Sequence, residues 1–481
     1  MNLDGILWDN LELFPHIQEN NRLEQQFYQK NDNRGRVREM TMHPILKSPL
    51  GKKLYENYAK YLPIIDYHNH LCVEDIFRDR VFENITQLWI AVDPYKHRAM
   101  RILGVPEKYI TGDATDFEKF EKWYGCLPRL VGNALYDWSC MEFDTVFGIA
   151  LEPFEQDPVA LYTQVNEKLK NLSAKKILSK FPIEYSAPCA VLTDDLSVFD
   201  GLEGICPSLR GDTVVAADQK FLHQLGQISG LADFWQVVEK RIVAFAEAGC
   251  RFSDHALDHG FAYVAEDGQN QDRFAKIVAG RPLTGEDKLA MESHILRGLG
   301  NLYAKHGITM QLHIGAKRTT SSRLRAIAGP AGGYAGIGSG VDVGALTDLL
   351  DDIEKMGGLP KTMLFTLNPA DNAVMAILSG SYSADGLQAV VTQGPAWWWC
   401  DHAQGMRDML EHFSAYSVLS TFMGMTTDSR SLLSFVRHDY FRQILCQWIA
   451  EKVEAGYFPE NEKLLGDLIT GMCYQNAKNY I

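Results

Sequence analysis

Residues 62–70 read LPIIDYHNH, a short apolar run that leads directly into two histidines. We interpret 62–66 as a buried parallel strand, because short apolar runs bounded by polar residues are typical of strands covered on both faces. His68 and His70 are two residues apart, so their imidazoles point to the same side of an extended chain. Two neutral imidazoles on one side can bind a single divalent ion.

The metal interpretation depends on where this motif lies, because two histidines at this spacing also occur by chance. Asp66 lies on the same side of the strand and could accept a hydrogen bond from a ligating imidazole. The alternative is a structural polar cluster. We favour a metal site because the histidines directly follow an apolar strand.

Further apolar runs follow along the chain, and amphipathic stretches of helical length separate most of them. The predicted strands are 62–66, 189–193, 202–208, 250–253, 308–312, 362–367, 387–392 and 420–427, and the clearest predicted helices are 231–248, 284–306, 344–356, 402–416 and 431–453. Eight strands joined by helices close a (β/α)₈ barrel, whose active site lies at the carboxyl ends of the strands. The sequence therefore predicts the α/β class and a TIM-type barrel.

No repeat or linker divides the 481 residues into separate domains. Residues 1–43 are polar and mixed, and we predict an N-terminal extension there, with the barrel over 44–481. The gap between the first two strands is too long for one crossover. Its tryptophans and tyrosines have helical spacing, which predicts a helical insertion at about 75–185 over the barrel mouth.

The composition limits the kinds of partner. A net charge of −14 at pH 7 argues against a broad nucleic-acid surface or an anionic membrane face, but not against a small anionic substrate. No apolar run approaches the ~20 residues that cross a bilayer, and the N-terminus lacks the pattern of a secretory signal. The nine cysteines include no CxxC pair, which indicates reduced thiols. We expect a cytoplasmic enzyme. The sequence does not fix its oligomeric state, and a homo-oligomer is possible.

Polar side chains end several of the other predicted strands. Asp428 ends the last strand, which adjoins the first strand when a barrel closes, so its carboxylate could bind the same metal and exchange a proton. The alternative for Asp428 is a helix N-cap. His313 ends the fifth strand and is either a further metal ligand or a hydrogen-bonded core histidine.

Arginines and tryptophans also lie near these strand ends. The arginines are Arg210, Arg318, Arg323 and Arg430. Because a guanidinium binds carboxylate or phosphate through two hydrogen bonds, several of them at one rim predict an anionic substrate, although any one alone is more often a surface residue. The segment PAWWWCDHAQG (395–405) could supply an aromatic wall for a sugar or simply core. The segment AGGYAGIGSG (331–340) lacks a preceding strand, so we predict a flexible loop.

Several longer motifs resemble the uronate isomerase family of the amidohydrolase superfamily. They are DYHNHL (66–71), YKHRAMR (95–101), GDATDFEKF (112–120), CRFSDHALD (250–258), QLHIGAKR (311–318), LNPADN (367–372) and MTTDSRSLLSFVRHDYFRQILC (425–446). The resemblance runs from about residue 45 to the C-terminus, with the motifs in the family's order. Members of the family interconvert D-glucuronate with D-fructuronate and D-galacturonate with D-tagaturonate.

The resemblance implies roles for individual residues. It implies that His68, His70 and Asp428 bind a divalent metal, which we expect to be zinc, with manganese, iron or cobalt as alternatives. It also implies that Asp428 is the proton-transfer base and that Tyr95 and Arg430 act beside it as catalytic residues. The predicted substrate-binding residues are Arg210, His313, Arg318, Trp397 and Trp398.

The chain departs from the family pattern at two places. Pro94 stands where the family has a substrate-contacting histidine, and His97, three residues on, need not face the same way. Thr319, Thr320 and Ser321 replace a run of asparagines. The alternative functions are a mononuclear hydrolase of the same superfamily (a lactonase or deaminase) and a sugar-acid-binding homologue with impaired catalysis. A binuclear hydrolase is disfavoured, because the end of the fourth strand offers Asp and His but no lysine.

Overall fold

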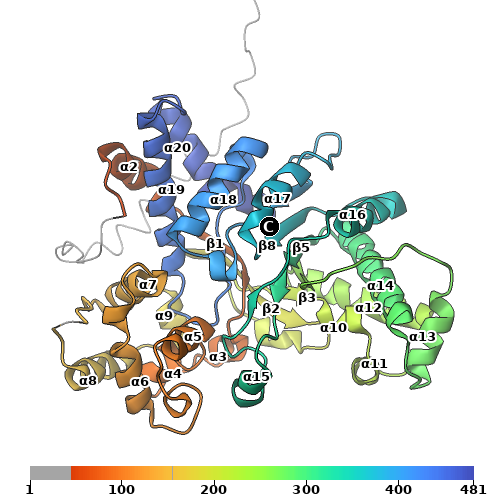
Figure 1. Cartoon of the computed structure of the whole chain (residues 1–481), viewed down its shortest axis with the longest axis horizontal. Helices are drawn as coiled ribbons and strands as arrows, with labels where there is room; N and C mark the ends of the chain where they lie inside the picture. Colours follow the sequence, from red (N-terminus) through yellow and green to blue (C-terminus); the bar gives the residue numbers. More distant parts are fainter. Residues whose placement is uncertain (1–44, 154) are drawn as a thin grey trace, which may run out of the picture. The chain divides into compact units, whose positions relative to one another are not determined.

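The computed structural model describes residues 45–153 and 155–481, and a parallel sheet forms its centre (Figure 1). The seven strands follow the order β1-β2-β3-β4-β5-β8-β9. Their bounds are β1 (Ile64–Asn69), β2 (Ile183–Val191), β3 (Ser208–Arg210), β4 (Phe252–Leu257), β5 (Thr309–Ile314), β8 (Thr362–Thr366) and β9 (Val391–Gln393). All neighbouring pairs are parallel. The predicted α/β barrel class is confirmed.

Helices connect and cover these strands. Those between β1 and β2 are α3 (Val73–Phe77), α4 (Ile85–Trp89), α5 (Pro94–Ile102), α6 (Asp116–Tyr124), α7 (Ala134–Glu142), α8 (Pro158–Leu169) and α9 (Ala174–Leu178). The later ones are α10 (Asp212–Ala216), α11 (Gln219–Leu225), α12 (Leu231–Glu247), α13 (Asn270–Val278), α14 (Gly285–His306), α15 (Ser322–Ala328), α16 (Val343–Gly357), α17 (Asn372–Leu378), α18 (Ala403–Tyr416), α19 (Val436–Glu454), α20 (Glu462–Thr470) and α21 (Asn476–Lys478), while α2 (Pro49–Leu54) precedes β1. None of the helices in the described part of the chain is both long and apolar enough to span a membrane.

Short helical turns and one small hairpin complete the structure. The turns are η1 (Tyr55–Ala59), η2 (Glu107–Tyr109), η3 (Leu127–Arg129), η4 (Phe143–Phe147), η5 (Leu196–Phe199), η6 (Pro369–Asp371), η7 (Trp398–Cys400), η8 (Leu419–Thr421) and η9 (Gly471–Gln475). β6 (Ala316–Lys317) pairs antiparallel with β7 (Gly336–Ile337). The segment predicted as a loop, 331–340, has no helix or strand apart from Gly336–Ile337, which pair with β6, and its flexibility stays a prediction.

The predicted strands agree with the structure best where the apolar run is continuous. The third prediction, 202–208, meets β3 only at Ser208, because the chain bends before it pairs. The predicted extension 1–43 lies outside the described residues, and the bounds 75–185 for a separate insertion stay a prediction. The segment between β1 and β2 is nonetheless largely helical, as Figure 1 shows for α3 to α9.

The predicted eighth strand, 420–427, is not a strand in this structure. Gly424 and Asp428 have positive φ angles of 75° and 45°, which interrupt an extended backbone. The segment still lies beside β1, but side chains replace much of the usual ladder: the His68 amide donates to Thr426 Oγ1 at 3.0 Å. Backbone bonds flank this contact, from Asp428 N to His68 O and from His70 N to Ser429 O. The chain therefore closes beside β1 as predicted, without a regular eighth strand.

The helix predicted at 431–453 begins later, at Val436. Serine side chains bind backbone amides just before it: Ser429 Oγ accepts from the Ser431 amide, and Ser431 Oγ accepts from the Leu433 amide. Such local bonds compete with helical hydrogen bonds and favour turns. Residues 432–435 therefore form a turn, and α19 begins only after it.

Candidate active site

The carboxyl ends of the strands surround a pocket that contains nearly all the predicted site residues. Its wall includes His68, His70, Tyr95, Arg210, His313, Arg318, Trp397, Trp398, Asp428 and Arg430. The exception is Arg323, an exposed residue of α15 that does not line the pocket, so its prediction as a pocket arginine is wrong. Sequence order could not reveal this, because β6 turns the chain away before α15 begins.

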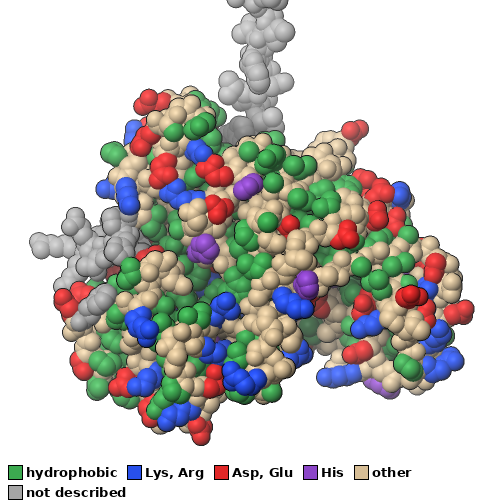
Figure 2. Space-filling model, viewed as in Figure 1, with side chains coloured by type: hydrophobic (Ala, Val, Ile, Leu, Met, Phe, Trp, Pro, Cys, Tyr) green, Lys and Arg blue, Asp and Glu red, His purple; other side chains and the backbone are tan. Residues whose placement is uncertain are grey.

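Charges on the surrounding surface are mixed. Figure 2 shows Lys and Arg side chains spread over the lower half of one face with acidic side chains between them, and acidic side chains over α16, the helix that carries Asp348, Asp351, Asp352 and Glu354. No broad basic surface appears on this face. The positive charge relevant to a small anion is instead inside the pocket, on its arginines.

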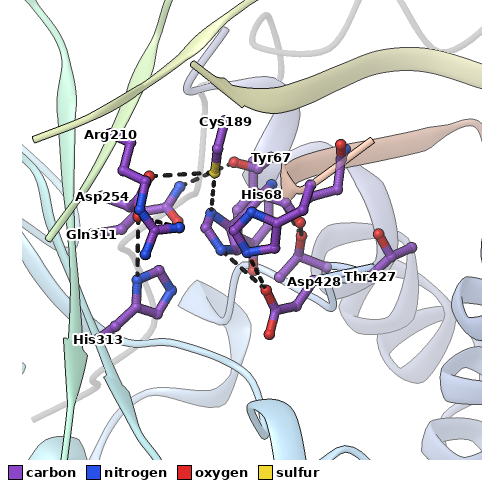
Figure 3. A network of polar contacts seen from close by, with 12 residues as sticks. Tyr67, His68, Cys189, Arg210, Asp254, Gln311, His313, Thr427 and Asp428 are labelled. Atoms are coloured by element: carbon purple, nitrogen blue, oxygen red, sulfur yellow. Dashed lines mark hydrogen bonds and ion pairs between the residues drawn. The ribbon is translucent and has the colours of Figure 1, made fainter. Parts of the chain in front are cut away.

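Two histidines and one carboxylate form the centre of the pocket (Figure 3). The Nε2 atoms of His68 and His70 lie 3.2 Å and 3.1 Å from Asp428 Oδ1. Ligand atoms bound at ~2.0–2.1 Å to one tetrahedral ion would be roughly 3.3 Å apart, so these separations suit shared ligation. Burial raises the pKa of the Asp428 carboxyl, but hydrogen bonds from the two histidines outweigh it and hold this pKa well below its usual value. Asp428 is therefore a carboxylate.

Asp66 holds the segment of Asp428 rather than the imidazole of a ligand. Its Oδ1 accepts from the Thr427 amide at 2.6 Å and from Thr426 Oγ1 at 2.9 Å, and its Oδ2 accepts from Thr427 Oγ1 at 2.8 Å. His438 Nε2 approaches the same carboxylate at 3.3 Å. The predicted bond from Asp66 to a ligating histidine is thus wrong, since the adjacent segment takes its lone pairs. Asp66 fixes Asp428 through the backbone.

Cys189 occupies the position expected of such a histidine partner, and sequence reasoning missed it. Its sulfur lies 3.6 Å from His68 Nδ1 and 3.3 Å from Asp254 Oδ1 (Figure 3). Among the described residues, His68, His70 and Cys189 form a group whose possible ligand atoms all lie within 4.8 Å of one another. The signal in the sequence was that residue 189 belongs to the second predicted strand, 189–193, and the structure pairs this strand with β1, with Asn69 opposite Pro188.

His313 lies against His68 and is available to a ligand. Their ring centres are 4.5 Å apart, and the Trp397 ring lies 4.6 Å from His313 on another side. Burial and the charge of His68 lower the pKa of His313 well below its usual value, so its ring is neutral. Its Nε2 is buried and has no hydrogen-bond partner in the described chain. A neutral, unpaired nitrogen here suits either a metal or a substrate hydroxyl.

Two of the pocket arginines are held by carboxylates. Arg210 lies 3.1 Å from Asp212 and 3.8 Å from Asp254. Arg318 Nε donates to both oxygens of Asp258, at 2.8 Å and 2.9 Å. Arginines oriented in this way keep other N–H groups free for an anion.

Tyr95 enters the pocket from the first turn of α5. Asp93 caps this helix by accepting from the Tyr95 amide at 2.9 Å, and Pro94 takes the first helical position, where proline is well tolerated. The Tyr95 hydroxyl is buried and has no hydrogen-bond partner among the described residues. Pro94 lines the pocket, whereas His97 is buried behind it and does not line it. His97 therefore does not take the place of the histidine that the resemblance predicts at position 94.

The 330–335 segment forms another part of the wall, which the sequence did not indicate. Pro330, Ala331, Gly333 and Ala335 line the pocket. The segment is tied to α5 by bonds from Arg101 to Gly332 O and from Arg98 to Ala335 O. A side chain at residue 333 would meet the Pro94 carbonyl oxygen at 2.3 Å, so only glycine allows this close approach.

The donor set fits a divalent ion. Two imidazoles, a carboxylate, a nearby thiol and the unpaired His313 Nε2 lie close together, with His68 and His313 buried and the others partly buried, and unpaired buried polar atoms are costly unless a ligand binds them. A carboxylate beside such an ion can also accept a proton from substrate. The pocket can thus combine metal binding, proton transfer and recognition of an anionic group.

Comparison with known proteins agrees with this geometry. The family model for glucuronate isomerase matches residues 39–481. A uronate isomerase of Bacillus licheniformis is 36% identical over 91% of this chain and 96% of its own length, and one of Caldicellulosiruptor bescii is 37% identical over 91% and 97%. The crystal structure of a uronate isomerase from Thermotoga maritima has a TM-score of 0.84 at 25% identity, covering 92% of this chain and all of its own. The glucuronate isomerase structure from Caulobacter crescentus shares the fold, with a TM-score of 0.82 at 22% identity.

Proposed function

The chain belongs to the glucuronate isomerase family, and we propose that it converts D-glucuronate into D-fructuronate and D-galacturonate into D-tagaturonate. The observation that supports this most is the pocket itself. The carboxylate of Asp428 lies between His68 and His70, with the unpaired Tyr95 hydroxyl and several arginines on the same wall. The chain is an isomerase, and the substrates and residue roles below are the proposal.

The reaction moves one proton between two carbon atoms. A base removes the proton from C2 of the open-chain aldose and returns it to C1, through an enediol. Asp428 is the proposed base, because its carboxylate is ionised and faces the pocket. The O1 and O2 atoms must also exchange a proton, and the Tyr95 hydroxyl, which lacks a partner, is placed to donate and accept it. Arg430, on the same wall two residues from Asp428, would stabilise negative charge on the enediol oxygens.

His68, His70 and Asp428 are the proposed metal ligands, with Cys189 and His313 close by. The bound ion would act as a Lewis acid towards the substrate oxygens. We propose zinc, because an imidazole-rich site beside a thiol suits a borderline-soft ion better than a hard one; manganese, iron and cobalt are the alternatives.

Substrate recognition follows from the charges and rings of the wall. The carboxylate at C6 distinguishes a uronate from a neutral sugar, and Arg210 and Arg318 already have the orientation to bind it. Trp397 and Trp398 offer aromatic faces to the sugar chain. The partner is thus a small hexuronate, and a cytoplasmic location would suit such a metabolic role.

A paired assay tests the proposal. Purified protein loaded with zinc or manganese is given D-glucuronate, D-galacturonate and, separately, a sugar lactone. Formation of the ketose product and hydrolysis of the lactone are followed in parallel. We expect ketose from the uronates and no hydrolysis. Lactone hydrolysis without ketose would instead identify a mononuclear hydrolase, and binding without either reaction would identify a sugar-acid-binding homologue.

A matched pair of variants controls this assay. Arg318→Met removes a guanidinium from the pocket wall, whereas Arg323→Met removes one from the exposed face of α15. We expect the first to raise KM for the uronates and the second to leave it unchanged. Equal effects would show that the pocket is not where the uronate binds.

A further inference from the structure

We propose that Arg437 is a positioning residue for this reaction. Its buried guanidinium would fix the Tyr95 ring relative to the backbone beside Asp428. The proposal rests on the proposed function, since it concerns the residues given catalytic roles there. Arg437 does not line the pocket, because it lies behind the residues that it would hold.

Arg437 makes contacts in two directions. It lies in the first turn of α19 and is 1% exposed. Its guanidinium carbon is 5.0 Å from the centre of the Tyr95 ring and 3.9 Å from that of Trp138. On the other side, Nη1 donates to the carbonyl oxygen of Thr427 at 3.0 Å. Thr427 directly precedes Asp428, so one guanidinium touches both catalytic elements.

Buried carboxylates explain why a cation is stable at this position. Asp401 Oδ2 lies 3.5 Å from Nη1, and the charges of Asp93 and Glu142 also favour the protonated guanidinium. A fully buried ion pair contributes little net stability compared with an apolar replacement. The Arg437 Nε has no hydrogen-bond partner in the described chain, so this side chain is not optimised for stability alone.

The planar guanidinium suits the task better than an ammonium. Its faces can stack on aromatic rings while its edge donates hydrogen bonds, a combination that lysine cannot reproduce. Among the described residues, the other ring contacts of Tyr95 are with Trp399 at 5.2 Å and Trp138 at 6.0 Å, both edge-on. Its hydroxyl has no partner among residues 45–153 and 155–481 to fix it. Without Arg437 the ring could rotate away from the substrate.

A second buried arginine on α19 provides a matched control. Arg442 is 3% exposed and donates to the carbonyl oxygens of Leu62 and Pro63 at 2.8 Å and 2.7 Å. These bonds join α19 to the start of β1 and touch no residue of the pocket wall. Arg442→Met therefore removes an equally buried guanidinium with a purely structural role.

The test compares Arg437→Met, Arg437→Lys and Arg442→Met in the metal-loaded enzyme. A shift of about 1 Å in a reacting group can cost ~10²-fold in rate. We expect Arg437→Met to lower kcat by about that factor with KM changed less than threefold, and Arg437→Lys to give a smaller loss. Arg442→Met should lower the unfolding temperature but leave kcat near wild type. If Arg437→Met does not fold, the lysine variant carries the test.

A double-mutant cycle with Tyr95→Phe separates positioning from general damage. If Arg437 acts through Tyr95, replacing it should cost much less in the Tyr95→Phe background than in the wild type. Equal costs in both backgrounds would overturn the proposal, as would an Arg437→Met loss no larger than that of Arg442→Met.

Crystal structures of the variants give a readout independent of activity. The Tyr95 ring should be displaced in Arg437→Met and unmoved in Arg442→Met. An unmoved ring in both overturns the positioning role. If the Tyr95 ring is displaced in Arg437→Met but the wild type itself has no isomerase activity, the proposed function is refuted while the positioning of Tyr95 by Arg437 is supported.

Discussion

Asp428 is joined to His68 twice, once through its side chain and once through its backbone. The carboxylate Oδ1 is 3.2 Å from His68 Nε2, and the Asp428 amide donates to the His68 carbonyl oxygen at 3.1 Å. The first strand and a late segment of the chain therefore form one rigid unit. The φ of 45° at Asp428 makes this double contact possible, because it turns the side chain back towards β1.

Replacing Asp428 by Asn should abolish turnover and preserve the fold. Asparagine is at least as well tolerated as aspartate at positive φ, and the backbone bond to His68 stays in place. An amide cannot act as the base. General acid–base catalysis typically contributes ~10²–10⁴-fold, so we expect kcat to fall at least ~10³-fold. Activity and circular dichroism check both parts. Near-normal activity would remove Asp428 from the mechanism.

Cys189 should contribute to metal affinity. Its sulfur can accept the Nδ1–H of His68, which keeps Nε2 free to bind the ion. Loss of such a partner typically costs ~10–100-fold in affinity, and we expect this for Cys189→Ala, with a smaller loss for Cys189→Ser. Competition with a chelating dye measures it. Cys206→Ala is the control, because Cys206 is not part of the group formed by His68, His70 and Cys189, and equal affinities for both alanine variants would contradict the prediction.

Pro94→His should improve catalysis on uronates. Pro94 lines the pocket at the position where the resemblance expects a substrate-contacting histidine, and His97 does not reach it. Most residues are acceptable at the first position of a helix, so the fold should lose less than about 1 kcal/mol. We expect a lower KM for at least one uronate. Pro94→Ala separates the gain of an imidazole from the loss of the ring, and an unchanged KM in both variants would show that residue 94 does not touch the substrate.

Asp401 should make stability depend on pH. Burial raises the pKa of its carboxyl to about 7, against an ordinary value of 3.8, although Arg437 opposes the shift. The folded protein thus holds this proton more tightly than the unfolded chain, so the associated stability is complete below pH 3.8 and is lost as pH rises towards 7. Relative to Asp401→Asn, the free energy of unfolding of the wild type should fall between pH 5 and 7 and then level off. Urea titrations measure it, and a constant difference would contradict the raised pKa.

Local patterns in the sequence predicted the parts of this fold that depend on local interactions. The strand at β1, the two histidines and the long helices α12, α14 and α16 follow from hydrophobic periodicity, and each lies within a few residues of its predicted bounds. The start of α19 was predicted too early, because the Ser429 and Ser431 hydroxyls bind the backbone before the helix begins. Such competition is not visible in hydrophobic periodicity.

Other features depend on residues that are distant in sequence. Cys189 reaches His68 only because β2 pairs with β1, and Arg437 of α19 contacts Tyr95 of α5 only in the folded chain. Arg323 has the same residue type as Arg318 but is exposed, since it lies on α15, whereas Arg318 directly follows β6. Residue type and spacing predicted the chemistry of the pocket. The residues that contact the pocket side chains from behind, Cys189 and Arg437, could be identified only from the tertiary structure.

Nuclear magnetic resonance in D₂O tests the central claim most directly. The zinc-loaded protein and its Asp428→Asn variant are each incubated with D-glucuronate and with D-galacturonate. The account predicts that the wild type forms D-fructuronate and D-tagaturonate, with deuterium at C1 to the extent that the protonated base exchanges with solvent before it returns the proton, and that the variant forms neither. Unchanged sugar signals with the metal-loaded wild type would contradict it.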